Sequence, residues 1–234
     1  MRGGIGLRAA RVHYGPLEAL HGVTLAAPAA ALTVLLGRNG AGRTTALRAL
    51  AGTVALTSGA VVRDGRDITR RPAHERAANG VCFIPDRRAV FASLTVAENL
   101  RLSYPAGDFT RALDAYPELR PLLRRRAGTL SGGEQRMLAL TRALLPGVDV
   151  VLADEPAQGM SPAVAARTYA LLTGLDACVV LAEQRLPPAL RESTGRTAVV
   201  HELRRGAVVF SGEAAEFGGE PGTLRPARTR RAPE

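Results

Sequence analysis

A nine-residue stretch, Gly37 to Thr45, constrains the fold of this chain more than any other part of the sequence. It reads Gly-Arg-Asn-Gly-Ala-Gly-Arg-Thr-Thr and joins an apolar run, Leu32 to Leu36, to the helix-forming residues 46–51. The three glycines allow the backbone to curl with its N–H groups inward, and the following helix adds the positive end of its dipole. The stretch therefore predicts a phosphate-binding loop between a buried strand and a helix.

One position departs from the phosphate-loop pattern, which has a lysine before the final Ser or Thr. Arg43 stands there, and the sequence contains no lysine at all, which indicates compositional drift as readily as local selection. A guanidinium keeps the charge but is wider and planar. A lost transition-state contact of about 2.7 kcal/mol would slow hydrolysis about a hundredfold, whereas we expect nucleotide binding to survive.

Composition excludes several classes of protein. With 234 residues, of which 46% are hydrophobic, the chain can bury one substantial core. The longest apolar stretch, Leu25 to Leu36, is interrupted by Pro28 and is shorter than the ~20 residues of a membrane span; with no leader pattern, we expect neither secretion nor membrane insertion. Cys82 and Cys178 are interpreted as buried thiols. The net charge is +10, but with 4% aromatic residues and scattered arginines no nucleic acid is expected as a partner.

Three segments predict β-hairpins. Residues 7–25 predict two short strands, with Tyr14 just before their turn, and further hairpins are predicted at Asp64-Gly65 and over residues 197–210. Tyr14 has two interpretations. It packs on a sheet, or its ring stacks on a purine near the phosphate loop.

Two capping boxes predict helix starts. Thr95 with Glu98 begins a helix in a lobe over residues 92 to 130 whose helical patterning is interrupted by prolines. Ser131 with Glu134 begins another, predicted to run to Leu145. This second start also contains Gly132 and Gly133, which are poor helix formers. It is either a well-capped helix and nothing more, or a place where the backbone approaches an anion closely.

Two apolar runs predict strands of a parallel sheet. Val148 to Asp154 is apolar enough to be covered on both faces, and it ends in the acidic pair Asp154 and Glu155. Ligands bind at this end of the strands in such sheets, so adjacent carboxylates there favour Mg²⁺ chemistry. The second run, Cys178 to Ala182, leads to Glu183 and Gln184.

Taken together, residues 7 to about 217 resemble the ATP-binding subunit of an ABC transporter. The resemblance depends on Leu-Ser-Gly-Gly-Glu-Gln-Arg at 130–136, followed closely by a strand ending in Asp-Glu-Pro at 154–156. Within the family, residues 85–100 and the Ala-Glu-Gln-Arg of 182–185 resemble the branch that serves branched-chain amino acid uptake.

The resemblance implies an α/β fold. It consists of a P-loop NTPase core with a mixed, largely parallel sheet flanked by helices, an antiparallel β subdomain and a small α-helical subdomain at about 92–145. The ATP-binding domain is expected over 1–217. Residues 218–234 are rich in Gly, Pro and Arg, which predicts a disordered basic tail that is either solvated or rests on an anionic membrane.

The resemblance also implies ATP and Mg²⁺ as ligands and assigns their residues. The expected nucleotide-binding residues are Tyr14, Gly37, Arg38, Asn39, Gly40, Ala41, Gly42, Arg43, Thr44, Thr45, Asp86, Ser131, Gly132 and Gly133. The expected metal ligands are Thr44, Asp154 and Asp86, and the expected catalytic residues are Glu155, Arg43 and Gln184. Asp86 replaces the glutamine and Gln184 the histidine that are usual in the family, and both are interpreted as markers of the amino acid uptake branch.

The implied partners are a second cassette, identical or different, integral membrane permease subunits and a solute-binding protein. Two cassettes would pack head to tail, with Ser131 of one facing the γ-phosphate held by the other, on the cytoplasmic, inner face of the membrane. The expected function is ATP hydrolysis coupled to amino acid import. The alternative is a regulatory or weakly hydrolysing cassette, because of Arg43. A cassette acting on ribosomes or DNA would be expected to carry a second cassette or a long insertion, and neither is present.

Overall fold

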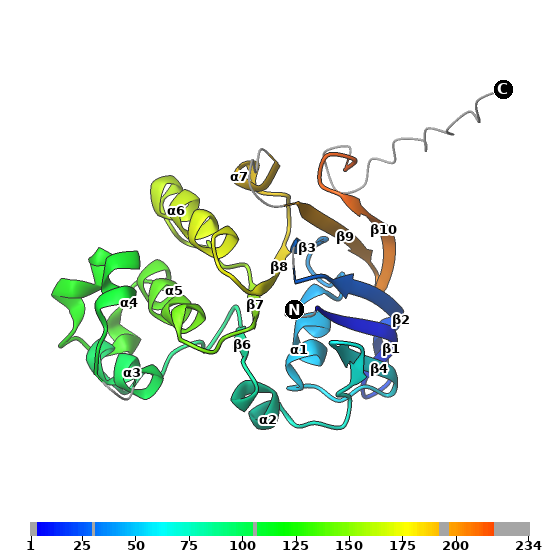
Figure 1. The fold of residues 1–234 in the computed structure, drawn as a ribbon, viewed down its shortest axis with the longest axis horizontal. Coiled ribbons are helices and arrows are strands. Elements are labelled where there is room, and N and C mark those ends of the chain that lie inside the picture. The colour runs from blue at the N-terminus through cyan, green and yellow to red at the C-terminus, as the bar shows by residue number, and fades with distance from the viewer. Residues whose placement is uncertain (1–3, 30, 105–106, 192–196, 218–234) are drawn as a thin grey trace.

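The strand that leads into the phosphate loop lies inside a six-stranded sheet (Figure 1). The computed structural model describes residues 4–29, 31–104, 107–191 and 197–217. Strand β3 (Leu32–Leu36) is buried at all five positions and pairs in parallel with β8 (Cys178–Glu183) on one side and β9 (Ala198–Arg204) on the other. The loop therefore begins at the carboxyl edge of a central strand.

The sheet extends outward from these three strands. Strands β7 (Val150–Asp154) and β6 (Val81–Ile84) continue it in parallel beyond β8, whereas β10 (Ala207–Glu213) closes the other edge antiparallel to β9. The order is β10-β9-β3-β8-β7-β6. Because β3, β7 and β8 are parallel, the residues that end them meet at one edge.

Each central strand contributes to two cores, because successive side chains point to opposite faces. Val151 and Ala153 of β7 belong to the core that also contains residues of the helical region, such as Leu138. Val150 and Leu152 belong to the other core, which contains helix α1 (Arg43–Ala51). This burial on both faces explains why the strands are nearly continuous apolar runs.

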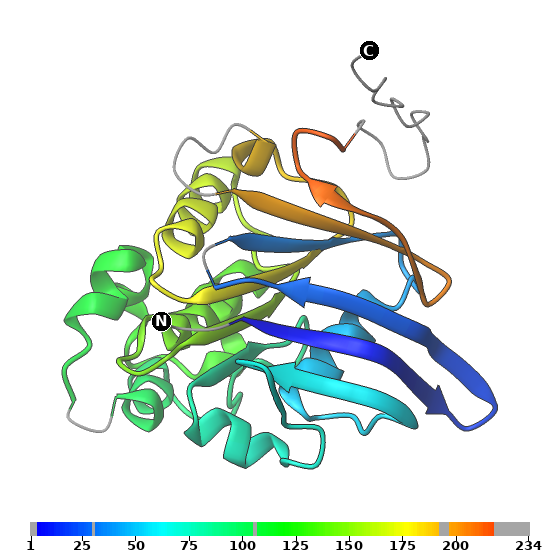
Figure 2. The ribbon, with the colours of Figure 1, turned by 45° about the vertical axis from the view of Figure 1, so that its right-hand side comes forward.

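A four-stranded antiparallel sheet shares the core of α1. It contains β1 (Ile5–Tyr14), β2 (Leu17–Ala27), β4 (Ser58–Arg63) and β5 (Arg66–Asp67), in the order β2-β1-β4-β5. Figure 2 shows its blue and cyan strands curving beside the orange strands of the larger sheet. All three predicted hairpins are confirmed, but the first pair of strands is ten and eleven residues long rather than short.

The helical region begins after β6. Helix α2 (Ala73–Ala78) precedes that strand, and α3 (Val96–Ser103), α4 (Thr110–Ala115) and the 3₁₀ turns η1 (Pro117–Leu122) and η2 (Ala127–Thr129) follow it. The capping box that starts α3 is present as predicted. Helices α3 and α4 lie in the green part of Figure 1, at the end of the molecule away from the antiparallel sheet.

Helix α5 (Gly132–Leu140) corrects one prediction. The helix expected to reach Leu145 ends at Leu140, and the chain continues as the tighter 3₁₀ helix η3 (Thr141–Leu144). The Thr141 hydroxyl donates to the carbonyl of Leu138 at 2.7 Å, and such back-bonding competes with regular helical geometry. Two further helices, α6 (Pro162–Thr173) and α7 (Pro188–Arg191), follow β7 and β8.

The predicted fold class is confirmed: a mixed, largely parallel sheet flanked by helices, with an antiparallel sheet and a helical region. Neither cysteine forms a disulfide; Cys178 is buried as predicted, whereas Cys82 is half-buried rather than buried. Burial raises the pKa of the Cys82 thiol to about 11. In the described part of the chain, no helix has the length and apolar character to cross a bilayer. The predicted tail, 218–234, lies outside the described residues.

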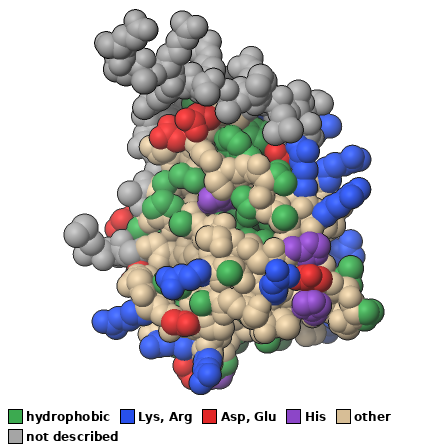
Figure 3. Space-filling view, turned by 90° about the vertical axis from the view of Figure 1, so that its right-hand side faces the viewer, with side chains coloured by type: hydrophobic (Ala, Val, Ile, Leu, Met, Phe, Trp, Pro, Cys, Tyr) green, Lys and Arg blue, Asp and Glu red, His purple; other side chains and the backbone are tan. Residues whose placement is uncertain are grey.

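Surface charge is distributed rather than continuous on the face drawn in Figure 3. Arginines lie among neutral and acidic side chains there, with several together at one edge. Outside the residues drawn in grey, this view contains no unbroken basic surface.

Candidate functional site

The phosphate loop has the backbone that its glycines predicted. Gly37, Gly40 and Gly42 have φ angles of 156°, 80° and 105°. A Cβ on Gly37 would lie 2.5 Å from the carbonyl oxygen of Leu203, so only glycine fits there. Gly42 precedes helix α1, whose start has no side-chain cap. The start of α1 therefore presents N–H groups and a positive dipole to an incoming anion.

A cavity of about 670 Å³ brings most of the predicted site residues together. Its walls include Asn39, Gly40, Ala41, Gly42, Arg43, Thr44 and Thr45 of the loop, together with Tyr14, Asp86, Asp154, Glu155 and Gln184. Gly37 and Arg38 do not line this cavity, and neither do Ser131, Gly132 and Gly133, which lie at the start of α5.

Arg43 makes a contact that the sequence did not predict. Its side chain is only 5% exposed, and Nη2 donates to Glu155 Oε1 at 3.1 Å and to Asn39 Oδ1 at 3.3 Å. Both bonds come from the same guanidinium nitrogen, Nη2. The substitution for lysine therefore joins the phosphate loop directly to the acidic end of β7.

Glu155 is held from two sides. The same oxygen that accepts from Arg43 also accepts from Gln184 Nε2 at 2.9 Å, and the Glu155 backbone N–H donates to Ala182 at 2.9 Å. Its φ is 46°, an unusual conformation for a residue other than glycine. The carboxylate is thus fixed beside the loop by donors from two different elements.

Asp154 is buried and has an orphaned oxygen. Burial raises the pKa of its carboxyl, a hydrogen bond from Thr44 lowers it, and the neighbouring Asp86 raises it. Its Oδ2 is buried with no hydrogen-bond partner in the described part of the chain. A hydroxyl and a carboxylate are hard oxygen donors that suit Mg²⁺, which commonly takes its other ligands from phosphate and water. The residues present therefore fit this ion.

Tyr14 lies where a base could reach it. The ring, at the end of β1, is 41% exposed and belongs to neither core. It lines the cavity of the phosphate loop and also a neighbouring one. This placement favours the stacking interpretation over packing on the sheet.

Arg136 is a site residue that sequence reasoning missed. It is buried within α5, and its guanidinium donates to the backbone oxygens of Pro85 at 2.6 Å, of Asp86 at 2.7 Å and of Asp154 at 3.2 Å. One side chain therefore connects α5 to the segment of Asp86 and to the end of β7. Arg136 ends the segment Leu-Ser-Gly-Gly-Glu-Gln-Arg at 130–136, but nothing in the spacing of that segment indicates that its side chain is buried.

The start of α5 is satisfied by its own residues. Ser131 Oγ accepts from the N–H of Glu134 at 3.2 Å, and the Glu134 carboxylate accepts from the N–H of Ser131 at 2.8 Å. A Cβ on Gly133 would lie 2.7 Å from the carbonyl oxygen of Gly159, so a close approach within the chain requires that glycine. A Cβ on Gly132 would meet nothing within 4 Å. Packing within the described chain does not explain Gly132.

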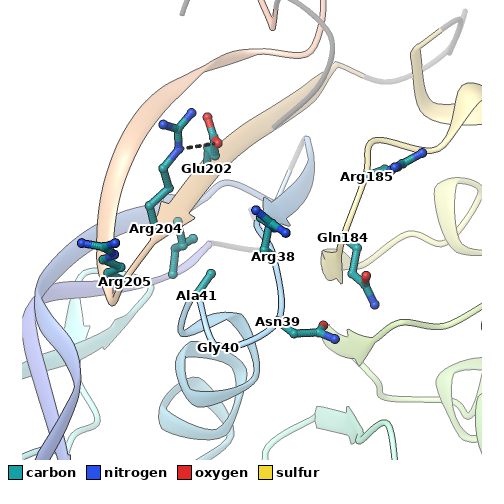
Figure 4. A pocket seen from close by; sticks show the side chains of 10 residues that line it. Arg38, Asn39, Gly40, Ala41, Gln184, Arg185, Glu202, Arg204 and Arg205 are labelled. Carbon is teal, nitrogen blue, oxygen red and sulfur yellow. Dashed lines mark hydrogen bonds and ion pairs between the residues drawn. The ribbon is translucent and has the colours of Figure 1, made fainter. Parts of the chain in front are cut away.

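A second cavity, of about 900 Å³, adjoins the loop on the side of β9 (Figure 4). Its lining includes four arginines, Arg38, Arg185, Arg204 and Arg205. Arg204 pairs with Glu202 at 2.9 Å, whereas the other three have no carboxylate partner among the described residues. Unpaired arginines beside a phosphate loop raise the local concentration of polyanions such as nucleoside triphosphates.

Known proteins are similar to this chain in sequence and in fold. Residues 20–158 match the family model described as ABC transporter. The chain is 38% identical to the probable branched-chain amino acid transport ATP-binding protein LivF of Archaeoglobus fulgidus, over 80% of this chain and 82% of that protein. It is 33% identical to the high-affinity branched-chain amino acid transport ATP-binding protein BraG of Pseudomonas aeruginosa, over 76% and 81% respectively.

A solved structure has the same fold. A dimeric ATP-binding cassette in a post-hydrolysis state, bound to ADP and Pi, superposes with a TM-score of 0.77 at 20% identity. The superposition covers 91% of this chain and 100% of that one.

Proposed function

The chain belongs to the ABC transporter family, in the branch of the branched-chain amino acid transport ATP-binding proteins, and we propose that it hydrolyses ATP to drive amino acid import through a membrane partner. One observation carries the proposal. A single cavity joins an uncapped, glycine-built helix start to Asp154, Glu155 and Gln184. A triphosphate, a metal and an attacking water all have suitable partners there.

In this proposal the loop binds the triphosphate and Tyr14 stacks on adenine. The N–H groups of the loop and the start of α1 neutralise phosphate charge, and the arginines of the second cavity attract ATP to the site. Mg²⁺, when bound, supplies further neutralisation at the β- and γ-phosphates. Thr44 and Asp154 would hold it, and Asp86 lines the same cavity.

Glu155 would position the attacking water. Its carboxylate, fixed by Arg43 and Gln184, accepts a hydrogen bond from the water and directs the oxygen toward the γ-phosphorus. The new P–O bond forms as the bond to the β–γ bridging oxygen breaks and the water's proton passes to the Glu155 carboxylate, which yields ADP and inorganic phosphate. This reaction needs positioning and charge neutralisation more than covalent help.

A second cassette would complete the site. Ser131, Gly132 and Gly133 do not line the cavity of their own chain, and Gly132 has no packing reason to be glycine. Both observations support contact with a γ-phosphate held by the partner. ATP bound only by the closed dimer at ~100 times its dissociation constant would stabilise closure by roughly 2.7 kcal/mol per site.

The membrane partners follow from the same assignment. We place the chain on the cytoplasmic face of the membrane, bound to permease subunits through the segment after Asp86. Arg136 contacts the backbone of Asp86 and supports this route, because it ties that segment to α5 and β7. A solute-binding protein would deliver the amino acid.

A second candidate is a cassette that binds ATP but hydrolyses it slowly. The Arg43–Glu155 ion pair favours it, since the guanidinium that should neutralise phosphate is shared with the catalytic carboxylate. Steady-state hydrolysis by the purified chain, with Arg43→Lys beside it, separates the two candidates. Brisk turnover by the unaltered chain supports the transport ATPase, whereas a slow parent accelerated about a hundredfold by Arg43→Lys supports the second candidate.

Coupling to transport needs its own experiment. The chain, co-purified with its membrane subunit and reconstituted in vesicles, is expected to drive ATP-dependent uptake of leucine, isoleucine or valine. If none of these were taken up but another solute were taken up in an ATP-dependent way, the amino acid assignment would be contradicted. ATP hydrolysis coupled to transport would remain supported.

A further inference from the structure

A buried acidic residue that the proposed mechanism does not use lies directly behind the site. Glu183 is the last residue of β8, and its carboxylate accepts a hydrogen bond from the Tyr169 hydroxyl at 2.7 Å. Tyr169 belongs to α6 and is 9% exposed. The bond therefore ties a helix on one face of the sheet to the strand end that carries Gln184.

The backbone around Glu183 meets the two other segments of the site. Its carbonyl oxygen accepts from the N–H of Gly37, the first glycine of the loop, at 3.3 Å. The preceding Ala182 accepts from the N–H of Glu155 at 2.9 Å, and the following Gln184 donates its side chain to Glu155. A displacement of Glu183 would thus move Gln184 relative to both the loop and Glu155.

The environment makes the Tyr169 bond necessary. Burial raises the pKa of Glu183 to about 7; the hydrogen bond from Tyr169 lowers it, and the charge of Glu155 raises it. A buried carboxyl without a partner is strongly disfavoured and would turn toward another donor. Tyr169 supplies the side-chain hydrogen bond that keeps this carboxyl in place.

We propose that Tyr169 and Glu183 are positioning residues that hold Gln184 where it meets the γ-phosphate. The inference rests on the proposed function and adds one contact to it: Gln184 lines the cavity that would hold the γ-phosphate, and its side-chain amide can donate a hydrogen bond there. Helix α6 also follows the segment of Gly159, against which Gly133 of α5 packs. The Tyr169–Glu183 bond therefore lies on a continuous path from the start of α5 to Gln184.

The test measures how well the site distinguishes a triphosphate from a diphosphate. Dissociation constants of Mg²⁺ with ADP and with the imido analogue of ATP are measured by calorimetry, which needs no turnover. Tyr169→Phe is expected to reduce the preference for the triphosphate about three- to tenfold, the range of one hydrogen bond, with ADP affinity unchanged.

The matched control is Tyr104→Phe. Tyr104 is also 9% exposed and its hydroxyl also donates a 2.7 Å bond, to the carbonyl of Thr141, away from the site. This variant is expected to lose stability but to keep the unaltered preference. Equal preferences in the two variants would mean that Tyr169 only fills the core, and would overturn the proposal.

Glu183 provides the conservative rescue. Glu183→Gln keeps an acceptor for Tyr169 and is expected to retain the preference, whereas Glu183→Ala is expected to lose it as Tyr169→Phe does. A retained preference in Glu183→Ala would also overturn the positioning role. If the unaltered chain bound neither nucleotide, the proposed function itself would fail, and the positioning role with it, an outcome distinct from both of these.

Discussion

Two glycine-containing helix starts, those of α1 and α5, differ in whether a side chain caps their backbone N–H groups. Helix α1 follows Gly42 in a left-handed conformation and has no side-chain cap. Helix α5 has a complete capping box between Ser131 and Glu134, with both bonds present. The first start leaves its donors for a ligand, whereas the second is stable before anything approaches it.

Glycine has a different role at each of the two helix starts. In the loop, backbone conformation and crowding demand glycine: a Cβ on Gly42 would lie 3.0 Å from the carbonyl of Ala19. In α5, Gly132 has an ordinary helical conformation and open space around it. The conformation of the chain itself thus requires glycine in the loop, whereas the space beside Gly132 is open to another molecule. Substitutions at and beside the two helix starts test this difference.

The largest effect is expected at the carboxylate beside α1. Glu155→Gln should lower the rate of ATP hydrolysis by about 10²- to 10³-fold, because the amide cannot accept the water's proton. The affinity for ATP should change little, since the N–H groups at the start of α1 remain. Turnover and nucleotide binding are measured on the same preparation. Loss of binding as well as turnover would show that Glu155 maintains the loop itself.

The next effect concerns the buried carboxyl behind the loop. The pKa of Glu183 is raised from 4.5 to about 7 in the folded chain. Its contribution to stability is therefore fully present below pH 4.5 and is lost as the pH rises through 7. Glutamine does not titrate, so Glu183→Gln does not undergo this loss. The free energy of unfolding of the variant minus that of the parent should therefore increase by about 2–3 kcal/mol between pH 4.5 and pH 8.

Urea unfolding at several pH values measures that growth. The matched control is Glu98→Gln at the start of α3, where hydrogen bonds from Thr95 lower the pKa of the carboxylate. Its difference from the parent should stay constant above pH 5. If the free energy of unfolding of Glu183→Gln and that of the parent changed equally with pH, a raised pKa of Glu183 would be contradicted.

One substitution made at each helix start gives effects of opposite sign. Gly42→Ala should destabilise the fold by about 1–3 kcal/mol and abolish nucleotide binding, because an alanine is strained at its φ of 105°. Gly132→Ala should stabilise the isolated chain by up to about 1 kcal/mol, since alanine is the better helix former. It should weaken only the ATP-dependent association of two cassettes. Similar losses of stability in both variants would end the contrast.

The smallest effect is expected from the cap of α5. Ser131→Ala removes the side-chain acceptor for the N–H of Glu134 and should cost about 1 kcal/mol, a fall in Tm of about 2–4 °C. Ser131→Asn, which keeps a capping oxygen, should restore most of that loss. Calorimetry measures both. An unchanged Tm in Ser131→Ala would mean that the start of α5 is held by packing alone.

Local patterns predicted much of this fold. The apolar runs of β3, β7 and β8, the three hairpins and both capping boxes are where the sequence placed them, since each depends on neighbours a few residues apart. The end of α5 was missed, because the hydroxyl of Thr141 bonds back to the preceding turn. The spacing of apolar residues does not encode such a bond.

Contacts between distant residues were the part that could not be predicted. Arg43 reaches Glu155 across 112 positions, and Arg136 crosses from α5 to Pro85 and Asp86. Tyr169 meets Glu183 only because α6 covers the face of the sheet where β8 ends. Each contact depends on which elements pack together, and no periodicity of one element carries that information.

The phosphate loop, the acidic strand end and the capped glycine-containing helix follow from the amino-acid sequence alone, because residue type and short spacing fix backbone conformation and charge. The bond from Arg43 to Glu155, and the position of the capped helix start outside the cavity of its own chain, depend instead on how the elements pack together. The reason is that parallel strands bring their carboxyl ends to one edge, where residues far apart in sequence become neighbours.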